Sequence, residues 1–124
     1  MTSRGLVFIL GTIVIVFGVI YLYYSNSIPG YTPDEARRLI SENKFDYIID
    51  VRTLEEWNEG HHPKAVLISL DSFVTELPQK IQNKNANILF VCRKGIRSSA
   101  AAAMARDLGF KNVSYVKGYH YGLR

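Results

Sequence analysis

An uncharged apolar run near the N-terminus divides this chain of 124 residues into two unequal parts. The run extends from Leu6 to Tyr24, which is 19 residues without a charged side chain. At a rise of about 1.5 Å per residue, a helix of this length is just long enough to cross the hydrocarbon core of a bilayer. We therefore predict an N-terminal tail over 1–5, a transmembrane helix over 6–24, a linker over 25–31 and one folded domain over 32–124.

Two alternatives to a membrane anchor stay open. Residues 25–27 offer the small side chains of a signal-peptide cleavage site, but the apolar run exceeds the usual signal core of roughly 7–15 residues, and Arg4 alone precedes it. A buried core helix fits less well because the run has no polar face. Tyr21, Tyr23 and Tyr24 cluster at its end, as aromatic side chains do at membrane interfaces. An uncleaved single-pass anchor is the preferred interpretation.

The charge distribution bears on sidedness and on partners. Arg4 precedes the apolar run, whereas Arg37, Arg38 and Lys44 follow it within about 20 residues, so the positive-inside rule leans toward a cytoplasmic domain. All 11 acidic residues and 14 of the 15 basic ones follow the run, which leaves the soluble part at about +3. This excess is too small to indicate nucleic-acid binding, and we expect none.

The soluble part alternates between predicted strands and helices. Apolar strands are expected at 45–49, 65–68, 88–91 and 113–116. Helices are expected after the capping boxes Thr32–Glu35 and Thr53–Glu56, after Asp71 or Ser72 with an interruption near Pro78, and over 98–108. This order indicates an α/β fold with a parallel sheet and helices on both of its faces. Ligands of such sheets bind beyond the carboxyl ends of the strands, where Asp50 and Cys92 fall.

The only cysteine, Cys92, is the candidate catalytic residue. It ends a predicted buried strand and is followed by a basic loop of Arg93, Lys94, Gly95, Ile96 and Arg97, and then by the helix from Ser98. Backbone N–H groups of such a loop converge on an anion, Gly95 supplies the conformational freedom, and the helix N-terminus adds partial positive charge. A thiolate nucleophile is favoured there, and an inert buried cysteine is the alternative. A lone cysteine excludes an intrachain disulfide, a CxxC pair and a multi-cysteine zinc site.

The stretch from Thr32 to Gly118 resembles a single rhodanese (sulfurtransferase) domain. The matching pieces occur in the order and at the spacing of that family: Ile49–Arg52, Glu56–Trp57, Glu59–His61, Pro63, Ala65, Cys92–Ser98, Ala100–Ala101, Leu108–Phe110, Val113 and Lys117–Gly118. The resemblance implies that Cys92 attacks the outer sulfur of a donor such as thiosulfate and holds it as a persulfide. A thiol, a protein or cyanide then accepts the sulfur, and no cofactor is implied.

The length and charge of the loop refine this expectation. Arg93, Lys94 and Arg97 would attract a dianion, as in the thiosulfate-using members of the family. Related phosphatases and arsenate reductases have five residues between the cysteine and the arginine, whereas four separate Cys92 from Arg97. We therefore expect a tetrahedral phosphate to be cramped here.

The remaining polar residues are expected to support the site. Asp50, Arg52 and Ser98 are the supporting candidates, and a structural salt bridge or turn hydrogen bonds explain the first two better than proton transfer does. His61 and His62 are interpreted as turn and packing residues, because two adjacent histidines without a third ligand are weak evidence for zinc. No metal site is predicted.

The sequence departs from the family at several positions. Lys64 and Ser69 replace a usual glycine and proline, which should change only a turn. Members usually continue with a second glycine after Gly118 and a helix that covers one sheet edge. Here Tyr119 follows, so we expect an edge left open to a partner, the membrane or a second copy, and no role is assigned to Tyr119, His120 and Tyr121. A membrane-tethered binding or sensing module with little turnover is therefore the alternative function.

Overall fold

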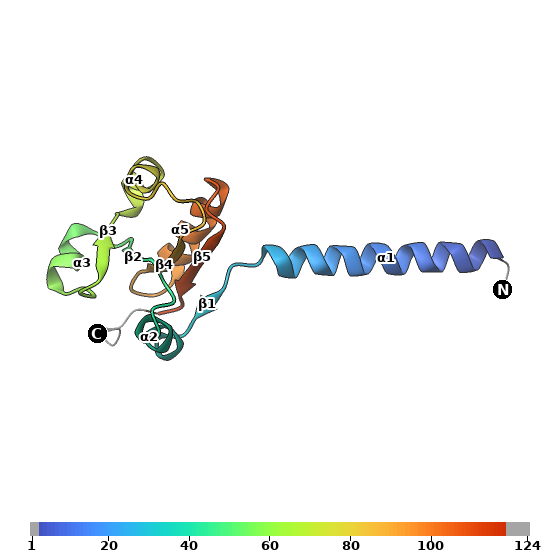
Figure 1. Ribbon diagram of the computed structural model, residues 1–124, viewed down its shortest axis with the longest axis horizontal. Coiled ribbons are helices and arrows are strands. Elements are labelled where there is room, and N and C mark those ends of the chain that lie inside the picture. Colours follow the sequence, from blue (N-terminus) through green and yellow to red (C-terminus); the bar gives the residue numbers. More distant parts are fainter. Residues whose placement is uncertain (1–2, 119–124) are drawn as a thin grey trace.

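A computed structural model of the chain describes residues 3–118, apart from the side chains of residues 23–26. A long helix, α1 (Ser3–Asn26), projects from an α/β domain (Figure 1). The expectations about Tyr119, His120 and Tyr121, and about the sheet edge beyond Gly118, lie outside the described residues. The domain consists, in order, of β1 (Gly30–Tyr31), α2 (Pro33–Ser41), β2 (Tyr47–Asp50), α3 (Leu54–Glu59), β3 (Ala65–Leu67), the 3-10 helix η1 (Leu70–Ser72), α4 (Phe73–Lys80), β4 (Asn87–Val91), α5 (Ile96–Asp107) and β5 (Asn112–Val116).

The strands form one parallel sheet in the order β1-β5-β4-β2-β3. This confirms the predicted α/β class. In the register of the two central strands, Asp50 of β2 pairs with Val91 of β4. Asp50 and Cys92 therefore lie at the same carboxyl edge of the sheet, on neighbouring strands.

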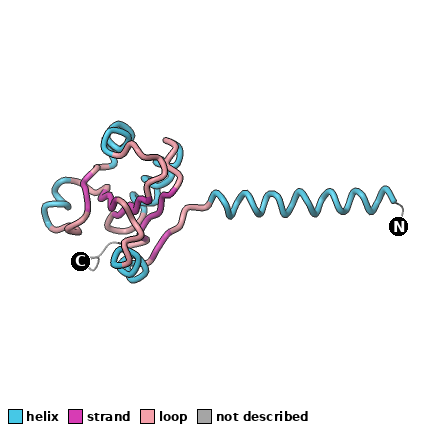
Figure 2. Tube along the Cα trace, viewed as in Figure 1, coloured by secondary structure: helices cyan, strands magenta, loops and turns pink. Residues whose placement is uncertain are grey.

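Helices cover both faces of the sheet, as the apolar strands predicted (Figure 2). On one face α4 and α5 pack against Ile88, Phe90 and Cys92 of the β4 segment, and on the other α2 packs against Leu89 and Val91. Because successive side chains of a strand point to opposite faces, every residue from Ile88 to Cys92 is buried. The uninterrupted apolar run before the cysteine thus follows from its central place in the sheet.

The capping residues of the two first domain helices behave as their sequences predicted. The Thr53 side chain accepts a hydrogen bond from the Glu56 N–H, and the Glu56 carboxylate accepts one from the Thr53 N–H, which completes a capping box at α3. At α2 the Thr32 side chain accepts from the Glu35 N–H, with proline at the first helical position. These caps fix where each helix begins.

The structure differs from the sequence prediction at the ends of several elements. Gly30 and Tyr31, predicted as linker, form the edge strand β1, which pairs with β5. The Tyr115 N–H donates to the Pro29 carbonyl, and the Lys117 N–H donates to the Tyr31 carbonyl. Two residues are too few to show a strand pattern, so only the pairing with β5 reveals them. The helix α5 begins at Ile96, two residues earlier than predicted, because Gly95 adopts a left-handed conformation immediately before it.

Pro78 does not interrupt its helix, contrary to the prediction. Helix α4 runs from Phe73 to Lys80 through the proline. A proline within a helix removes one N–H donor, here toward the carbonyl of Val74, and the helix continues because Phe73 and Leu77 are fully buried in the core. The Ile81 N–H also bonds to the Leu77 carbonyl, which closes the last turn.

Helix α1 is long and apolar enough to cross a membrane. A 20-residue stretch, Ser3–Leu22, has a mean hydropathy of 2.7, and none of it is buried in the structure. A signal sequence near the N-terminus would satisfy the same criterion of length and composition. Among the described residues, neither of the two buried core clusters includes a residue of α1. The domain therefore builds its core without the helix.

Candidate functional site

The loop between β4 and α5 wraps around the sulfur of Cys92. The Sγ atom accepts hydrogen bonds from the backbone N–H groups of Gly95, at 3.0 Å, and Ser98, at 3.3 Å. Both donors come from the first turn of α5 or its cap, where the helix carries partial positive charge. The side chain of Cys92 is 1% exposed, so these N–H groups, and not water, surround the sulfur. N–H donors and a helix N-terminus around one atom favour negative charge there.

Gly95 is required by the loop geometry. Its φ of 90° is in the left-handed region, which side chains other than glycine rarely adopt. A Cβ atom at this position would lie 2.6 Å from the carbonyl oxygen of Lys117, at the end of β5. The loop therefore packs directly on the neighbouring strand, and only a residue without a side chain allows that contact.

Ser98 joins the sulfur to two backbone segments. Its Oγ atom lies 3.4 Å from Cys92 Sγ, and its hydroxyl is within 3.1 Å of both the Gly95 and Val116 carbonyl oxygens. The residue is completely buried. Ser98 thus ties the loop, the start of α5 and the end of β5 together beside the thiol.

A cavity of about 330 Å³ opens above the cysteine. It is lined by Cys92, by four residues of the predicted loop and by one residue from α3: Glu56, Cys92, Arg93, Lys94, Ile96 and Arg97. Lys94 and Ile96 are exposed at its rim. The structure thus brings together the thiol, the helix N-terminus and all three predicted cations, and adds a carboxylate that the sequence prediction did not place here.

Glu56 forms a two-point ion pair with Arg97. The guanidinium Nη1 and Nη2 atoms lie 2.7 Å and 3.0 Å from the two carboxylate oxygens. These hydrogen bonds lower the pKa of Glu56 to about 2 and raise the pKa of Arg97, so both groups stay ionised at neutral pH. Arg93 also faces acidic side chains, with nitrogen atoms 3.9 Å from Glu56 and 3.4 Å from Glu59. Much of the positive charge expected from the loop is therefore balanced by α3.

The sequence did not reveal that Glu56 pairs with Arg97, because Glu56 also has a capping role in its own helix. Glu56 completes the capping box with Thr53, which explains its presence without any reference to a site. A topological signal was nevertheless available, because α3 follows β2 directly and β2 is adjacent to β4. A helix that starts beyond the carboxyl end of β2 begins beside the loop that follows β4. Acidic residues in the first turn of α3, such as Glu56, are therefore within reach of Arg97.

Asp50 and Arg52 form a buried ion pair that shapes the edge of the sheet. The guanidinium of Arg52 contacts both Asp50 carboxylate oxygens at 2.8–3.0 Å and donates to the Gly60 carbonyl at 2.7 Å. The Ser69 hydroxyl donates to the Arg52 carbonyl at 2.8 Å, so the residue that departs from the family pattern still holds this corner. These bonds link both ends of α3 to the sheet and position Glu56 over the cavity.

The histidines have packing and turn contacts. The ring of His61 stacks on Trp57 with centroids 3.5 Å apart, and its Nδ1 atom lies 2.9 Å from the Trp57 carbonyl oxygen. His62 is buried, its Nδ1 accepts from the Lys64 N–H, and its pKa is lowered by burial and by the charge of Lys64. Within residues 3–118, no group of three or more His, Cys, Asp or Glu side chains could hold a metal ion.

Curated proteins are similar to this chain over about 70% of its length. The tRNA uridine(34) hydroxylase of Sodalis glossinidius is 32% identical over 92 residues, which is 71% of this chain and 26% of that protein. The hydroxylase of Yersinia enterocolitica is 35% identical over 89 residues, covering 68% of this chain and 25% of that protein. The chain therefore spans about a quarter of the length of these curated relatives.

Solved structures share the fold. A human single-domain sulfurtransferase, 24% identical, superposes with a TM-score of 0.67 over 77% of this chain and 95% of its own. A Rhodopseudomonas palustris protein described as a possible tyrosine phosphatase, 28% identical, has the same TM-score over 78% of this chain and 80% of its own. The family model described as Rhodanese-like domain matches residues 32–119, which include every residue of the site. The chain belongs to the rhodanese-like domain family.

Proposed function

We propose that the protein is a sulfurtransferase that carries sulfane sulfur on Cys92. The observation that supports this most directly is the pair of N–H donors, from Gly95 and Ser98, aimed at one buried sulfur atom. Such a cradle stabilises a thiolate before the reaction and a persulfide after it. The cavity above gives a small donor access to the sulfur.

The proposed reaction has two displacement steps. The Cys92 thiolate attacks the outer sulfur of thiosulfate, the S–S bond of the donor breaks, and sulfite leaves with the bonding electron pair. The terminal sulfur of the resulting persulfide is then attacked by the acceptor, which is cyanide in an assay and a thiol or protein in the cell. The Cys92–S bond breaks and the thiolate is regenerated, so the enzyme is unchanged after each cycle.

Phosphoryl transfer is the less favoured chemistry for this loop. Phosphatase activity is the relevant alternative because one structural neighbour is described as a possible tyrosine phosphatase. In this chain four residues separate Cys92 from Arg97, and the guanidinium of Arg97 is held by Glu56. An arginine bound in this way is poorly placed to clamp a phosphate dianion as well.

A binding or sensing module is the second candidate function. The pairing of Arg97 and Arg93 with Glu56 and Glu59 favours it, because these ion pairs weaken the attraction for an anionic donor. In that case Cys92 would take up one sulfur atom, or be oxidised by a peroxide, and an external thiol would regenerate it only slowly. The same protein can be assayed for both functions.

Helix α1 is proposed as an uncleaved single-pass anchor with the domain on the cytoplasmic side. Its length, its mean hydropathy of 2.7 and its complete lack of burial support the anchor. The excess of arginine and lysine after the span supports the orientation.

The test is to load the protein with sulfur and then unload it. The protein is incubated with thiosulfate and its intact mass is measured, after which cyanide is added and thiocyanate is assayed, with Cys92→Ser as the control. We expect a gain of one sulfur atom on Cys92 that is released over many cycles. Sulfur gained once and retained would instead support the sensing module, and no gain by folded protein would exclude thiosulfate as the donor.

A further inference from the structure

The edge strand β1 covers only part of β5. It pairs with Tyr115 and Val116, so no strand of the described chain pairs with the amino half of β5 on that side. The Tyr115 N–H donates to the Pro29 carbonyl, and the next bond of this ladder would require an N–H group at position 29. Proline has no N–H group, so the pairing stops there. It leaves an open position beside residues 112–114.

A cavity of about 340 Å³ lies at this open position, and its volume is within the range of roughly 300–1,000 Å³ that small-molecule sites occupy. This β5 cavity is bounded by β1, by the end of α2 with the turn that follows it, and by the starts of β4 and β5. Its lining includes Tyr31, Lys44, Phe45, Asn87, Lys111 and Asn112. Asn87 begins β4 and Cys92 follows its end, so the β5 cavity and the cavity above Cys92 lie at opposite edges of the sheet.

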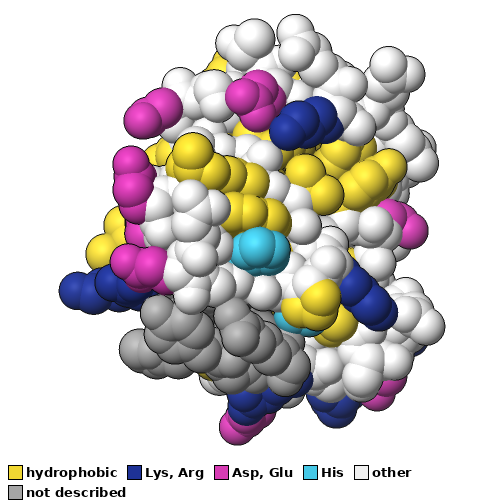
Figure 3. Space-filling model, turned by 90° about the vertical axis from the view of Figure 1, so that its left-hand side faces the viewer, with side chains coloured by type: hydrophobic (Ala, Val, Ile, Leu, Met, Phe, Trp, Pro, Cys, Tyr) yellow, Lys and Arg dark blue, Asp and Glu magenta, His cyan; other side chains and the backbone are white. Residues whose placement is uncertain are grey.

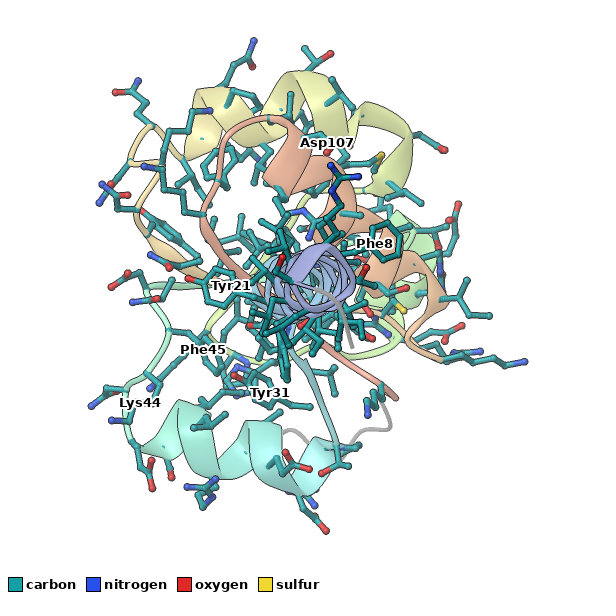
Figure 4. All side chains as sticks on the ribbon, turned by 90° about the vertical axis from the view of Figure 1, so that its right-hand side faces the viewer. Phe8, Tyr21, Tyr31, Lys44, Phe45 and Asp107 are labelled. Atoms are coloured by element: carbon teal, nitrogen blue, oxygen red, sulfur yellow. The ribbon has the colours of Figure 1, made fainter. Side chains whose placement is uncertain are left out.

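Two aromatic rings line the β5 cavity. The ring centroids of Tyr31 and Phe45 lie 6.2 Å apart, with an angle of 58° between the ring planes. Both side chains are half-buried and pack against the core cluster on the α2 face of the sheet. Figure 4 shows the two rings side by side, with Lys44 farther from the axis of α1. A flat ring bound here can stack on one of them and contact the edge of the other.

Two lysines supply positive charge to the same cavity. Lys44 and Lys111 are exposed, and neither forms an ion pair with an acidic side chain of the described residues. The acidic neighbours of Lys44 in the chain are engaged elsewhere, because Glu42 pairs with an arginine of α2 at 3.5 Å and Asp46 accepts from the Asn87 N–H at 2.8 Å. Among the described residues that line the cavity, two carry positive charge and none carries negative charge.

Cations elsewhere on the molecule have acidic neighbours. In the cavity above Cys92, Arg97 pairs with Glu56, and Arg93 lies 3.4 Å from Glu59. Figure 3 shows the end of the molecule away from α1, where acidic and basic side chains are mixed. The β5 cavity thus combines an aromatic wall with positive charge that is not balanced in this way.

We propose that the β5 cavity binds a small aromatic carboxylate. Its ring lies against Tyr31 and Phe45, and its carboxylate pairs with Lys44 and Lys111. Ammonium groups are compact point charges on flexible stems, so they can meet one carboxylate without a fixed two-point geometry. The amide groups of Asn87 and Asn112 are available to a polar substituent on the ring. The proposal goes beyond sulfur transfer and does not depend on it.

The experiment titrates benzoate into the deuterated, nitrogen-labelled full chain in phosphatidylcholine nanodiscs and follows the backbone amide NMR signals. Benzamide keeps the ring without the charge, and acetate keeps the charge without the ring. We expect saturable shifts at residues 111–114 with benzoate, several-fold weaker affinity for benzamide, and no saturable shifts with acetate over the same concentration range. High salt should weaken the binding of benzoate more than that of benzamide.

Substitutions separate the two parts of the site. The double variant Lys44→Gln and Lys111→Gln should bind benzoate several-fold more weakly and leave the affinity for benzamide unchanged. Lys80→Gln, an exposed lysine of α4 that lies 3.6 Å from Glu76, is the matched control. Phe45→Leu should weaken the binding of both aromatic ligands. Melting curves show whether this half-buried substitution disturbs the fold, and the exposed lysines test the site in either case.

Several results would overturn the proposal. Shifts at Gly95 and Ser98 in place of residues 111–114 would assign benzoate to the cavity above Cys92. Equal affinity for benzoate and benzamide, or for the wild type and the double lysine variant, would show that the lysines do not recognise an anion. The absence of saturable shifts at every amide would exclude this class of ligand. Sulfur loading of Cys92 is measured separately, so none of these results bears on the proposed sulfur transfer.

Discussion

At the scale of single residues, the site depends on a few buried polar contacts around one sulfur atom. The N–H groups that donate to the Cys92 sulfur belong to the backbone, so no side-chain substitution removes them directly. Ser98 and Glu56 are different, because each acts through its own side chain. Ser98 holds the loop closed beside the thiol, and Glu56 sets the charge of the cavity. Substitutions at these two positions therefore separate geometry from electrostatics.

Ser98→Ala should weaken both the fold and the reaction. The change removes the buried hydroxyl donor beside the Gly95 and Val116 carbonyl oxygens. Losing a buried hydrogen-bond partner costs about 1–3 kcal/mol, so the melting temperature should fall. Sulfur loading of Cys92 from thiosulfate should slow as well. Ser99→Ala, whose hydroxyl is on the exposed side of the same turn, should change neither quantity.

Glu56→Gln should favour anionic sulfur donors. The substitution keeps an acceptor for the Thr53 N–H and removes the charge that neutralises Arg97. We expect the KM for thiosulfate to fall several-fold at low ionic strength, with a smaller effect at high salt. Glu55→Gln, on the same helix turn but outside the cavity, is the matched control. An unchanged KM in Glu56→Gln would show that Arg97 does not act on the donor.

The Glu56–Arg97 pair should also make stability depend on pH. Hydrogen bonding to Arg97 lowers the pKa of Glu56 from its ordinary 4.5 to about 2. A carboxyl group with a lowered pKa stabilises the folded state above the ordinary value, and this contribution disappears as the pH falls from 4.5 toward 2. The difference in melting temperature between wild type and Glu56→Gln should therefore be constant above pH 4.5 and shrink on acidification. A constant difference throughout would contradict the ion pair.

At the scale of elements, the turn from β4 into α5 is where local sequence and tertiary contact meet. Gly95 ends the loop in a left-handed conformation and caps α5, which begins at Ile96. The same glycine touches the backbone at the end of β5. The chemistry of the loop therefore depends on a strand that follows it about 20 residues later in the chain.

Gly95→Ala should abolish sulfur loading while Gly109→Ala leaves it intact. Both glycines have a positive φ, 90° and 100°, so either alanine costs about 1–3 kcal/mol of backbone strain. Only at Gly95 would the new Cβ meet backbone, 2.6 Å from the Lys117 carbonyl oxygen, whereas at Gly109 the nearest atom is 3.9 Å away on the Lys84 side chain. Thiosulfate-dependent mass gain and melting curves of both variants provide the comparison. Equal loss of sulfur loading in the two would assign the effect to strain alone.

At the scale of the whole molecule, the anchor and the domain are separable. The two core clusters draw on the sheet and on helices α2, α4 and α5, with Ile28 as the first residue that packs against them. No residue of the apolar stretch Ser3–Leu22 is buried, and none belongs to that core. The core of the domain is therefore built without any contribution from α1.

A fragment of residues 27–124 should fold and load sulfur as the full chain does. Its melting temperature should match that of the domain in the full chain, because removing α1 takes away no described core contact. It should remain in the aqueous phase after centrifugation with vesicles at physiological salt, whereas the full chain should sediment with them. A fragment that aggregates or melts at a much lower temperature would show that α1 supports the domain.

The sequence alone determined the class of fold and the position of the candidate nucleophile. Alternation of apolar strands with capped helices is a local pattern, and so is a lone cysteine between a buried strand and a basic, glycine-containing loop. Such patterns can be recognised from the sequence because each involves only residues that are close together in the chain.

Only the tertiary structure decided which distant groups meet. The pairing of Gly30–Tyr31 with β5, and the ion pair between Glu56 and Arg97, join segments 41 to 85 residues apart. Neither leaves a local pattern, because two residues are too short to show a strand and Glu56 already has a capping role in its own helix. The fold therefore changed a cationic loop into a largely charge-balanced cavity. It also placed that cavity at the carboxyl edge of the parallel sheet, where Asp50 and Val91 end neighbouring strands.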